Sequence, residues 1–202
     1  MYRQVGRLSG ICFILLSSLA SGGESKFNRV LAVGDDGPAW GSLVGVDGKM
    51  SALKDFQKAK VVVLVFTCNH CPVARQYENR LRNLAQKYEK LDVQVVAISV
   101  SLHAADGLEA MKKRATEQKL TWPWLHDPSQ ASAKAYGATA TPQFFVLDSR
   151  RKVAYMGAFD NDLIADDATA HYVDDAVAAL LAGNTPSVKE SLQRGCPIDY
   201  DE

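Results

Sequence analysis

The sequence predicts an α/β fold in which a central mixed sheet is flanked by helices. Two runs rich in β-branched residues, 61–66 and 93–100, have the composition of strands that are buried on both faces. Each run is followed by a stretch with helical spacing of apolar residues, and this alternation is typical of a parallel sheet. A third run, 143–147, turns at 148–151 into 153–156, which predicts an antiparallel pair of strands.

The first 20 residues predict a signal peptide rather than a part of the fold. Two arginines precede an apolar core at 11–16, which includes Cys12, and small residues lead up to Ala20. The core is too short and too rich in serine for a convincing membrane span. We therefore expect export to the periplasm or another extracytoplasmic compartment, with cleavage near Ala20 and no stable membrane span afterwards. An uncleaved N-terminal anchor is the alternative.

A short hairpin precedes the strand 61–66, and a long helix follows it. Residues 40–46, followed by the turn Asp47-Gly48, predict the hairpin in front of the domain. Pro72 favours the first turn of a helix, and apolar residues recur at three- and four-residue steps from there to Tyr88. This helix is therefore separated from the strand 61–66 by only a short junction.

Leu108, Met111 and Ala115 mark the helix after the run 93–100, and two more helices and a loop are predicted further along the chain. Asp127 as N-cap and Pro128 at the first helical position predict the start of one helix, which Gly137 ends. The other helix is expected over about 171–182. Before it, the acidic residues of 160–167 predict a solvent-exposed loop.

Composition and organisation argue against several classes of protein. Lysine plus arginine total 23 and aspartate plus glutamate total 23, so no strong net charge favours nucleic acid. Neither an internal repeat nor a linker rich in glycine and serine divides the chain. We therefore expect one domain, residues 33–184, preceded by the signal peptide 1–20 and followed by a C-terminal tail, residues 185–202.

The feature that carries chemistry is a pair of cysteines, Cys68 and Cys71, between the strand 61–66 and the helix that starts at Pro72. A helix N-terminus favours a thiolate over a thiol, because its dipole and its unpaired N–H groups stabilise negative charge. A C-x-x-C pair at such a junction predicts a redox-active dithiol. A structural zinc site is the alternative, but it needs about four ligands, and the sequence has no second C-x-x-C or His-x-x-x-His to complete one.

The segment Phe66-Thr67-Cys68-Asn69-His70-Cys71-Pro72 resembles the signature of the thioredoxin-like superfamily, and in particular of extracytoplasmic redoxin proteins of the AhpC/TSA and TlpA-like type. The resemblance extends over about residues 33–200. It implies a thioredoxin-like fold with a sheet of about five strands. It also implies that Cys68 is the attacking nucleophile, that Cys71 resolves the mixed disulfide, and that the two form a redox-active disulfide.

The two residues between the cysteines are predicted to tune the dithiol. Asn69 can donate a hydrogen bond, and His70 adds a donor or a positive charge near the sulfur atoms. A histidine before the second cysteine resembles the sites of disulfide isomerases and periplasmic disulfide oxidases. A more stable thiolate would make the dithiol a stronger oxidant. A solvent-exposed His70 without this role is the alternative.

Thr141-Pro142 resembles the cis-proline site of thioredoxin-like proteins, which faces the dithiol. In that family the residue before the proline pairs its backbone with a bound partner, so Thr141 and Pro142 are the predicted partner-binding residues. Sequence alone would favour a trans bond, since only about 5–6% of X–Pro bonds in folded proteins are cis. An ordinary proline in an edge strand is the alternative.

Two departures from related families limit what the resemblance implies. Thioredoxin keeps a buried carboxylate on the central strand as a proton acceptor, whereas residues 61–66 contain no acid. Peroxiredoxins carry P-x-x-x-T-x-x-C, whereas Val65 stands three residues before Cys68, and Cys68 stands three residues before Cys71. Peroxidase activity is therefore disfavoured.

The remaining cysteine and histidines carry weaker signals. Cys196 lies in the tail and either forms a disulfide, with the active site or with another chain, or stays a free thiol. His103, His126 and His171 are scattered along the chain, and we expect them to be surface or packing residues.

The function predicted from these features is thiol–disulfide exchange through Cys68 and Cys71 with protein or small-molecule thiols and disulfides. No cofactor is needed, because the dithiol carries the electrons. One alternative is a thiol-dependent peroxidase with an antioxidant role. The other is a module that binds and delivers Cu(I) through Cys68, Cys71 and His70. The favoured function involves no metal and no nucleic acid.

Overall fold

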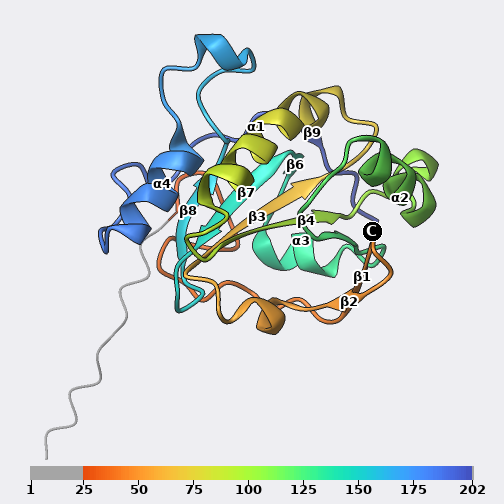
Figure 1. Cartoon of the computed structure of the whole chain (residues 1–202), viewed down its shortest axis with the longest axis horizontal. Helices are drawn as coiled ribbons and strands as arrows, with labels where there is room; N and C mark the ends of the chain where they lie inside the picture. The colour runs from red at the N-terminus through yellow and green to blue at the C-terminus, as the bar shows by residue number, and fades with distance from the viewer. Residues whose placement is uncertain (1–24, 202) are drawn as a thin grey trace, which may run out of the picture.

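Strands and helices follow one another in the alternation that the sequence predicts (Figure 1). The structure is a computed structural model that describes residues 25–201, so the predicted signal peptide and Cys12 lie outside the described residues. The strands are β1 (Leu43–Gly45), β2 (Met50–Ser51), β3 (Val61–Thr67), β4 (Val93–Ser99), β5 (Trp124–His126), β6 (Ala140–Thr141), β7 (Gln143–Leu147), β8 (Val153–Gly157) and β9 (Cys196–Pro197). The helices are α1 (Pro72–Tyr88), α2 (Leu108–Glu117), α3 (Ala131–Tyr136) and α4 (Tyr172–Leu181), with short 3-10 helices η1 (Leu53–Phe56), η2 (Ala104–Asp106) and η3 (Ala165–Asp167).

The main sheet has seven strands in the order β2-β1-β5-β4-β3-β7-β8. β3 lies inside the sheet, parallel to β4 and antiparallel to β7, so the sheet is mixed as predicted. It has more than the expected five strands because the N-terminal hairpin of β1 and β2 joins it, with β1 antiparallel to β5. The hairpin is thus one edge of the sheet rather than a separate element in front of the domain.

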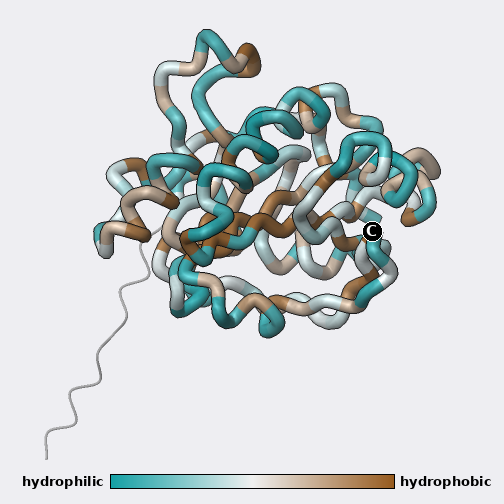
Figure 2. Tube along the Cα trace, viewed as in Figure 1, coloured by the Kyte–Doolittle hydropathy of each residue, from teal (hydrophilic) through white to brown (hydrophobic). Residues whose placement is uncertain are grey.

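β3 is buried on both faces, as its apolar run predicts. Each side chain from Val61 to Phe66 is at most 1% exposed. Alternate residues of a strand point to opposite faces. Val61, Val63 and Val65 therefore join the core cluster formed with α1 and α4, and the three residues between and after them join the cluster formed with α3. Figure 2 shows the hydrophobic strand in the middle of the molecule, with hydrophilic helix surfaces around it.

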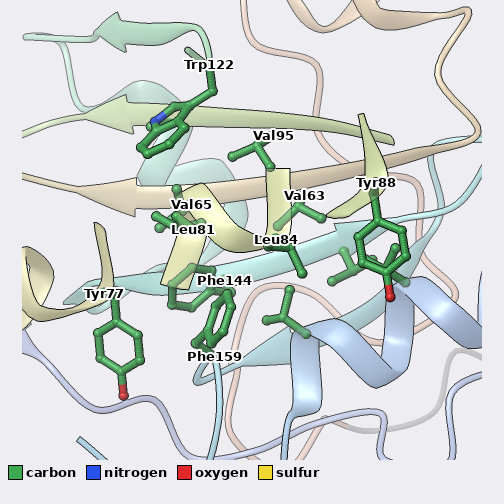
Figure 3. Packing of buried hydrophobic residues seen from close by; sticks show 14 of the residues in the cluster. Val63, Val65, Tyr77, Leu81, Leu84, Tyr88, Val95, Trp122, Phe144 and Phe159 are labelled. Atoms are coloured by element: carbon green, nitrogen blue, oxygen red, sulfur yellow. The ribbon is translucent and has the colours of Figure 1, made fainter. Parts of the chain in front are cut away.

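The apolar stripe of α1 packs against the sheet. The buried residues of the helix follow the predicted spacing and are Ala74, Tyr77, Leu81, Leu84 and Tyr88. The four larger ones join Val63 and Val65 of β3 in one cluster, which the rings of Phe144 and Phe159 complete with their centroids 5.2 Å apart (Figure 3), whereas Ala74 packs against the two cysteines. Full burial of one such side chain stabilises a fold by about 1.5–3 kcal/mol. This packing fixes the helix at whose N-terminus the cysteines lie.

The start of α3 differs from the prediction. The sequence predicts an N-cap at Asp127 and a first helical residue at Pro128, but the helix begins at Ala131. Gln130 has a left-handed backbone (φ 59°), which interrupts any helix before it. The buried carboxylate of Asp127 instead accepts hydrogen bonds from the backbone N–H and hydroxyl groups of the two serines that follow it in the chain, residues 129 and 132.

The sequence predicts that the acidic segment 160–167 is solvent-exposed, but the structure buries its first residue. Asp160 is only 2% exposed. Arg80 of α1 donates to the Asp160 carboxylate at 2.5 Å and to the Asp162 carbonyl at 2.7 Å. The Tyr77 hydroxyl also donates to Asp160, at 3.2 Å. The segment is therefore anchored to α1 at its first residue and is exposed only further along.

The C-terminal tail packs back onto the domain. Its segment 189–191 exchanges backbone hydrogen bonds of 3.1 Å with Met156 of β8. Further along, β9 pairs antiparallel with β6, and Cys196 stands opposite Thr141. Gly195 permits this approach, because any Cβ there would collide with the Thr141 carbonyl. The tail thus brings Cys196 to the C-x-x-C pair.

Candidate active site

The two cysteines of the C-x-x-C pair lie where the sequence predicts, in the segment between β3 and α1, and Figure 1 labels these two elements. Cys68 directly follows β3, and Cys71 is the N-cap of α1. The backbone N–H groups of His70 and Cys71 act to lower the pKa of Cys68, and the N–H of Ala74 donates to Cys71 Sγ at 3.4 Å. Both sulfur atoms therefore lie at the positive end of a 17-residue helix.

One disulfide bond joins Cys71 to Cys196, with the two Cα atoms 6.2 Å apart. Cys68 is a free thiol. The structure brings all three cysteines into one cluster, but the bond that it holds differs from the predicted Cys68–Cys71 disulfide. Of the alternatives for Cys196, a bond to the active site is the one that the structure contains.

Thr141 and Pro142 face the cysteines, and the peptide bond between them is cis, as the resemblance implies. The Thr141 hydroxyl lies 3.4 Å from Cys68 Sγ, within hydrogen-bond distance for sulfur. The Thr141 carbonyl oxygen lies 3.1 Å from Cys71 Sγ. One residue therefore contacts both sulfur atoms of the C-x-x-C pair, and β9 occupies its backbone edge.

A carboxylate that the sequence analysis missed, Asp106 of η2, holds the loop between the cysteines. Its Oδ1 accepts the backbone N–H groups of Asn69 at 2.5 Å and of His70 at 2.9 Å. Its Oδ2 accepts the Ser101 hydroxyl at 2.6 Å and pairs with His70 Nδ1. Because the Asp106 side chain is fully buried, these partners replace the water that a carboxylate requires. Asp106 also supplies an acid near the cysteines, which the central strand lacks.

The charge of Asp106 orients His70. Burial raises the pKa of Asp106, but the hydrogen bonds from Ser101 and His70 outweigh burial and hold this pKa below its usual value. The ionised carboxylate favours a proton on His70 Nδ1. The His70 side chain is 44% exposed and stacks on His103, with ring centroids 4.9 Å apart. His70 is thus fixed by an acid and by a second ring, and His103 is a packing residue of the site.

Asn69 hydrogen-bonds to two elements beside the C-x-x-C loop. Its side-chain amide donates to the Ala105 carbonyl at 2.9 Å, and its own carbonyl accepts from Arg75 Nε at 2.6 Å. These hydrogen bonds join the C-x-x-C loop to η2 and to α1. The amide of Asn69 therefore holds the loop in place in this state, and its predicted tuning of the dithiol stays a prediction.

The pKa of the Cys68 thiol lies above its ordinary value. Burial is the largest cause, the hydrogen bond with Thr141 opposes it, and the negative charge of Asp106 adds to it. The N–H groups at the start of α1 also oppose the rise but do not outweigh burial. In this oxidised state, with Cys68 only 4% exposed, burial therefore outweighs the groups that stabilise the thiolate, and the stabilised thiolate of the reduced dithiol stays a prediction.

Alkylation of Cys68 in the oxidised protein is consequently expected to require alkaline pH. The reaction with iodoacetamide follows the thiolate fraction, so its midpoint should lie above about 8.5, the usual pKa of cysteine. Mass spectrometry of the tryptic peptide 61–75 measures the label as a function of pH. A midpoint below about 7.5, in the range of activated cysteines, would show that the helix N-terminus outweighs burial.

A cavity of about 360 Å³ gives access to Cys68. Its lining includes Cys68, His70 and Thr141 together with residues 197–201 of the tail. A substrate that reaches Cys68 through this cavity must therefore contact the tail.

Cys68, His70 and Asp106 each offer one atom that could bind a metal, and these atoms lie within 4.8 Å of one another. This group differs from the Cu(I) ligands that the sequence suggests, because Cys71 is part of a disulfide and has no thiolate to offer. A Cu(I) site through both cysteines would require reduction of the bond between Cys71 and Cys196.

The strand order contains a signal that indicates Asp106. β4 is parallel to β3 and adjacent to it, so the carboxyl ends of the two strands meet at the same edge of the sheet. The segment 100–106 that follows β4 therefore lies beside the cysteines that follow β3. This strand order places the polar residues of the segment near the cysteines: Ser101, His103 and Asp106.

Comparison with known families gives one match. A sequence model of the AhpC/TSA family matches residues 33–156, a range that includes the C-x-x-C pair, Asp106 and the cis-proline. A comparison with curated proteins found no match.

Several solved structures resemble the chain. An uncharacterized conserved protein from Geobacillus kaustophilus is 31% identical, with a TM-score of 0.79 over 86% of this chain and 95% of its own. A hypothetical protein from Sinorhizobium meliloti 1021 is 26% identical, with a TM-score of 0.79 over 86% of this chain and 97% of its own. The thioredoxin domain of a thiol-disulfide oxidoreductase from Bacteroides vulgatus is 21% identical, with a TM-score of 0.53 over 61% of this chain and 86% of its own. This last likeness concerns the fold alone.

Proposed function

The chain belongs to the AhpC/TSA family and has a thioredoxin-like fold, and on this premise we propose that it is a thiol–disulfide oxidoreductase. Cys68 is the nucleophile and Cys71 the resolving cysteine. The observation that carries the proposal is the contact of both sulfur atoms with Thr141, the residue before a cis-proline, while the Cys68 thiol lines an accessible cavity. The substrates are protein or small-molecule thiols and disulfides.

The proposed reaction passes through a mixed disulfide on Cys68. In the reduced protein the Cys68 thiolate attacks a substrate disulfide, an S–S bond to Cys68 forms, and the leaving thiolate takes up a proton. The Cys71 thiolate then attacks Cys68 Sγ, which releases the second substrate thiol and leaves Cys68 and Cys71 joined. The same steps in reverse oxidise a dithiol substrate.

Three further residues support this chemistry. His70 lines the cavity beside Cys68 and can exchange a proton with a leaving thiol. Asp106 fixes the ring of His70 and the backbone of the loop. The Thr141 hydroxyl, 3.4 Å from Cys68 Sγ, stabilises the thiolate by a hydrogen bond.

Substitution of the two cysteines is expected to separate the two steps. Cys68→Ser should reduce the rate of insulin disulfide reduction to that of dithiothreitol alone, because no nucleophile remains. Cys71→Ser should accumulate a mixed disulfide with glutathione on Cys68, seen by intact mass, because the resolving thiol is missing. Cys12→Ser is the control and should keep full activity, since Cys12 lies in the predicted signal peptide. Normal activity of Cys68→Ser would contradict the proposal.

A thiol-dependent peroxidase is a second candidate, which the match to the AhpC/TSA family favours. Hydrogen peroxide would oxidise the Cys68 thiolate to a sulfenic acid, and a thiol would then condense with it to a disulfide and water. Consumption of peroxide by the reduced wild type, but not by Cys68→Ser, would support this activity. Oxidation no faster than that of free cysteine would dismiss it.

The proposed place of action is outside the cytoplasm. It rests on the predicted signal peptide and on the persistence of disulfides in extracytoplasmic compartments. Within residues 25–201, no helix is both long and apolar enough to cross a membrane. A mature N-terminus just after Ala20, found by sequencing protein from an extracytoplasmic fraction, would support export with cleavage.

A further inference from the structure

We propose that Cys196 is a third redox residue and that the disulfide moves within one chain between Cys71–Cys196 and Cys68–Cys71. The inference rests on the proposed function, because it gives the resolving cysteine of that reaction a second partner. The structure holds the Cys71–Cys196 bond and leaves Cys68 as a thiol. The three side chains pack together in one cluster, so a free thiol lies beside a disulfide.

The three cysteines are arranged around Thr141. Cys68 Sγ lies 3.4 Å from the Thr141 hydroxyl, and Cys71 Sγ lies 3.1 Å from the Thr141 carbonyl oxygen. Cys196 stands opposite Thr141 in the pairing of β6 with β9. Cys71 is 0% exposed, so an external thiol cannot approach its sulfur atom while the site is closed. The thiol of Cys68, in contrast, already packs against Cys71 within the site.

The migration of the disulfide balances without a further reactant. The Cys68 thiolate attacks Cys71 Sγ, and the Cys68–Cys71 bond forms as the Cys71–Cys196 bond breaks. Cys196 leaves as a thiolate and takes up the proton that Cys68 has lost. One disulfide and one thiol are present before and after the step, so neither an oxidant nor a reductant is consumed.

The tail is built to hold Cys196 at this place. Gly195 approaches the Thr141 carbonyl so closely that a residue with a Cβ atom would not fit there. On the other side of Cys196, the Ile198 N–H donates to the Thr139 carbonyl at 3.0 Å. These contacts flank the cysteine on both sides and are made by the backbone rather than by the cysteine sulfur.

A buried glutamine clamps the end of the tail. Gln130, which is 1% exposed, donates to the Asp199 carbonyl at 2.8 Å and accepts the Asp201 N–H at 2.9 Å. The Tyr200 hydroxyl donates to the Ala138 carbonyl at 2.6 Å. The tail can therefore keep the released Cys196 thiol near Cys71, which makes the exchange reversible.

The migration has a consequence for substrate access. While Cys71 is bonded to Cys196, β9 occupies the backbone edge of β6 at Thr141, where a substrate is expected to pair. Once the disulfide has moved to Cys68 and Cys71, the tail is held only by non-covalent contacts and can give way to a substrate. A substrate thiol can then attack Cys68, which lines the cavity.

Tryptic peptides distinguish the two disulfides. Cleavage after Lys60, Arg75 and Arg194 places Cys68 and Cys71 in peptide 61–75 and Cys196 in peptide 195–202. The full-length protein with one disulfide is incubated with N-ethylmaleimide at mildly alkaline pH, quenched with acid and digested. We expect the linked pair of peptides to decline, and an internally bridged 61–75 to appear in equal amount with labelled 195–202.

Matched variants and dilution complete the experiment. In Cys68→Ser, or in Cys68→Ala if the serine variant does not fold, the linked pair should persist and 195–202 should stay unlabelled. The rate in the wild type should not depend on protein concentration, because the exchange is intramolecular. A linked pair that persists in the wild type, with label on Cys68 alone, would overturn the proposal and make Cys71–Cys196 a fixed structural bond.

Insulin reduction by Cys196→Ser separates this inference from the proposed function. If this variant exchanges disulfides while the wild type shows no migration, the proposed migration of the disulfide is overturned and the proposed function stands. If the disulfide migrates but neither the wild type nor this variant reduces insulin, the proposed migration stands and the proposed function is overturned.

Discussion

Replacing Arg80 by methionine is expected to lower the free energy of unfolding by about 3–5 kcal/mol, the usual cost of removing one partner of a buried ion pair. The Arg80 and Asp160 side chains are 10% and 2% exposed, and Arg80 Nη1 donates to the Asp160 carboxylate at 2.5 Å. Methionine keeps much of the apolar volume of arginine but leaves Asp160 buried without its cation. The substitution also removes the donor to the Asp162 carbonyl, which anchors the acidic segment to α1.

Urea unfolding of the variant and of a control measures this effect. A shift of the midpoint with an unchanged m-value reports a change in stability alone. Lys87→Met, on the same helix, breaks an exposed pair with Asp174 whose side chains are 55% and 27% exposed, and it should cost at most about 1 kcal/mol. In Asp160→Asn/Arg80→Met the buried charge is absent, so the double variant should be more stable than Arg80→Met. Equal losses in Arg80→Met and Lys87→Met would contradict the argument.

The elements that local patterns determine could be predicted from the sequence. The strand 61–66 and the helix from Pro72 to Tyr88 have uninterrupted patterns of apolar residues, and the structure confirms both. The start of α3 could not be predicted, because no local pattern indicates the left-handed backbone of Gln130, whose side chain bonds to the distant tail. The burial of Asp160 was missed for the same reason, since its partner lies 80 residues earlier.

The candidate site shows the same division. Cys68, Cys71 and the cis-proline belong to motifs that a resemblance identifies. Asp106 and Cys196 reach the site through the order of the strands and the return of the tail, and Cys196 lies 125 residues from Cys71 in the chain. No spacing rule connects residues so far apart. The sequence left the partner of Cys196 open, and Asp106 could be assigned to the site only through the order of the strands.

Replacing Asp106 by asparagine is expected to destabilise the fold by about 1.5–3 kcal/mol at neutral pH, the range for a hydrogen bond to a charged group. Asparagine has nearly the same size but only one acceptor oxygen, so its NH2 group would face donors such as the Ser101 hydroxyl or the His70 N–H. The loop between the cysteines would keep a weaker anchor, because a neutral oxygen replaces a charged one. The pKa of the Cys68 thiol should fall, because the negative charge of Asp106 contributes to raising it.

The pH dependence of stability tests the charge of Asp106 separately from its shape. Its pKa is lowered in the folded state, so its contribution to stability is present above the unfolded value of about 3.9 and is lost as pH falls through the folded value. The difference in unfolding free energy between wild type and Asp106→Asn should be largest at neutral pH and should narrow below about pH 4. Ser101→Ala, which removes one donor and keeps the carboxylate, should cost less and should not lower the pKa of Cys68. If Asp106→Asn leaves that pKa unchanged, Asp106 holds the loop without acting on the reactive sulfur.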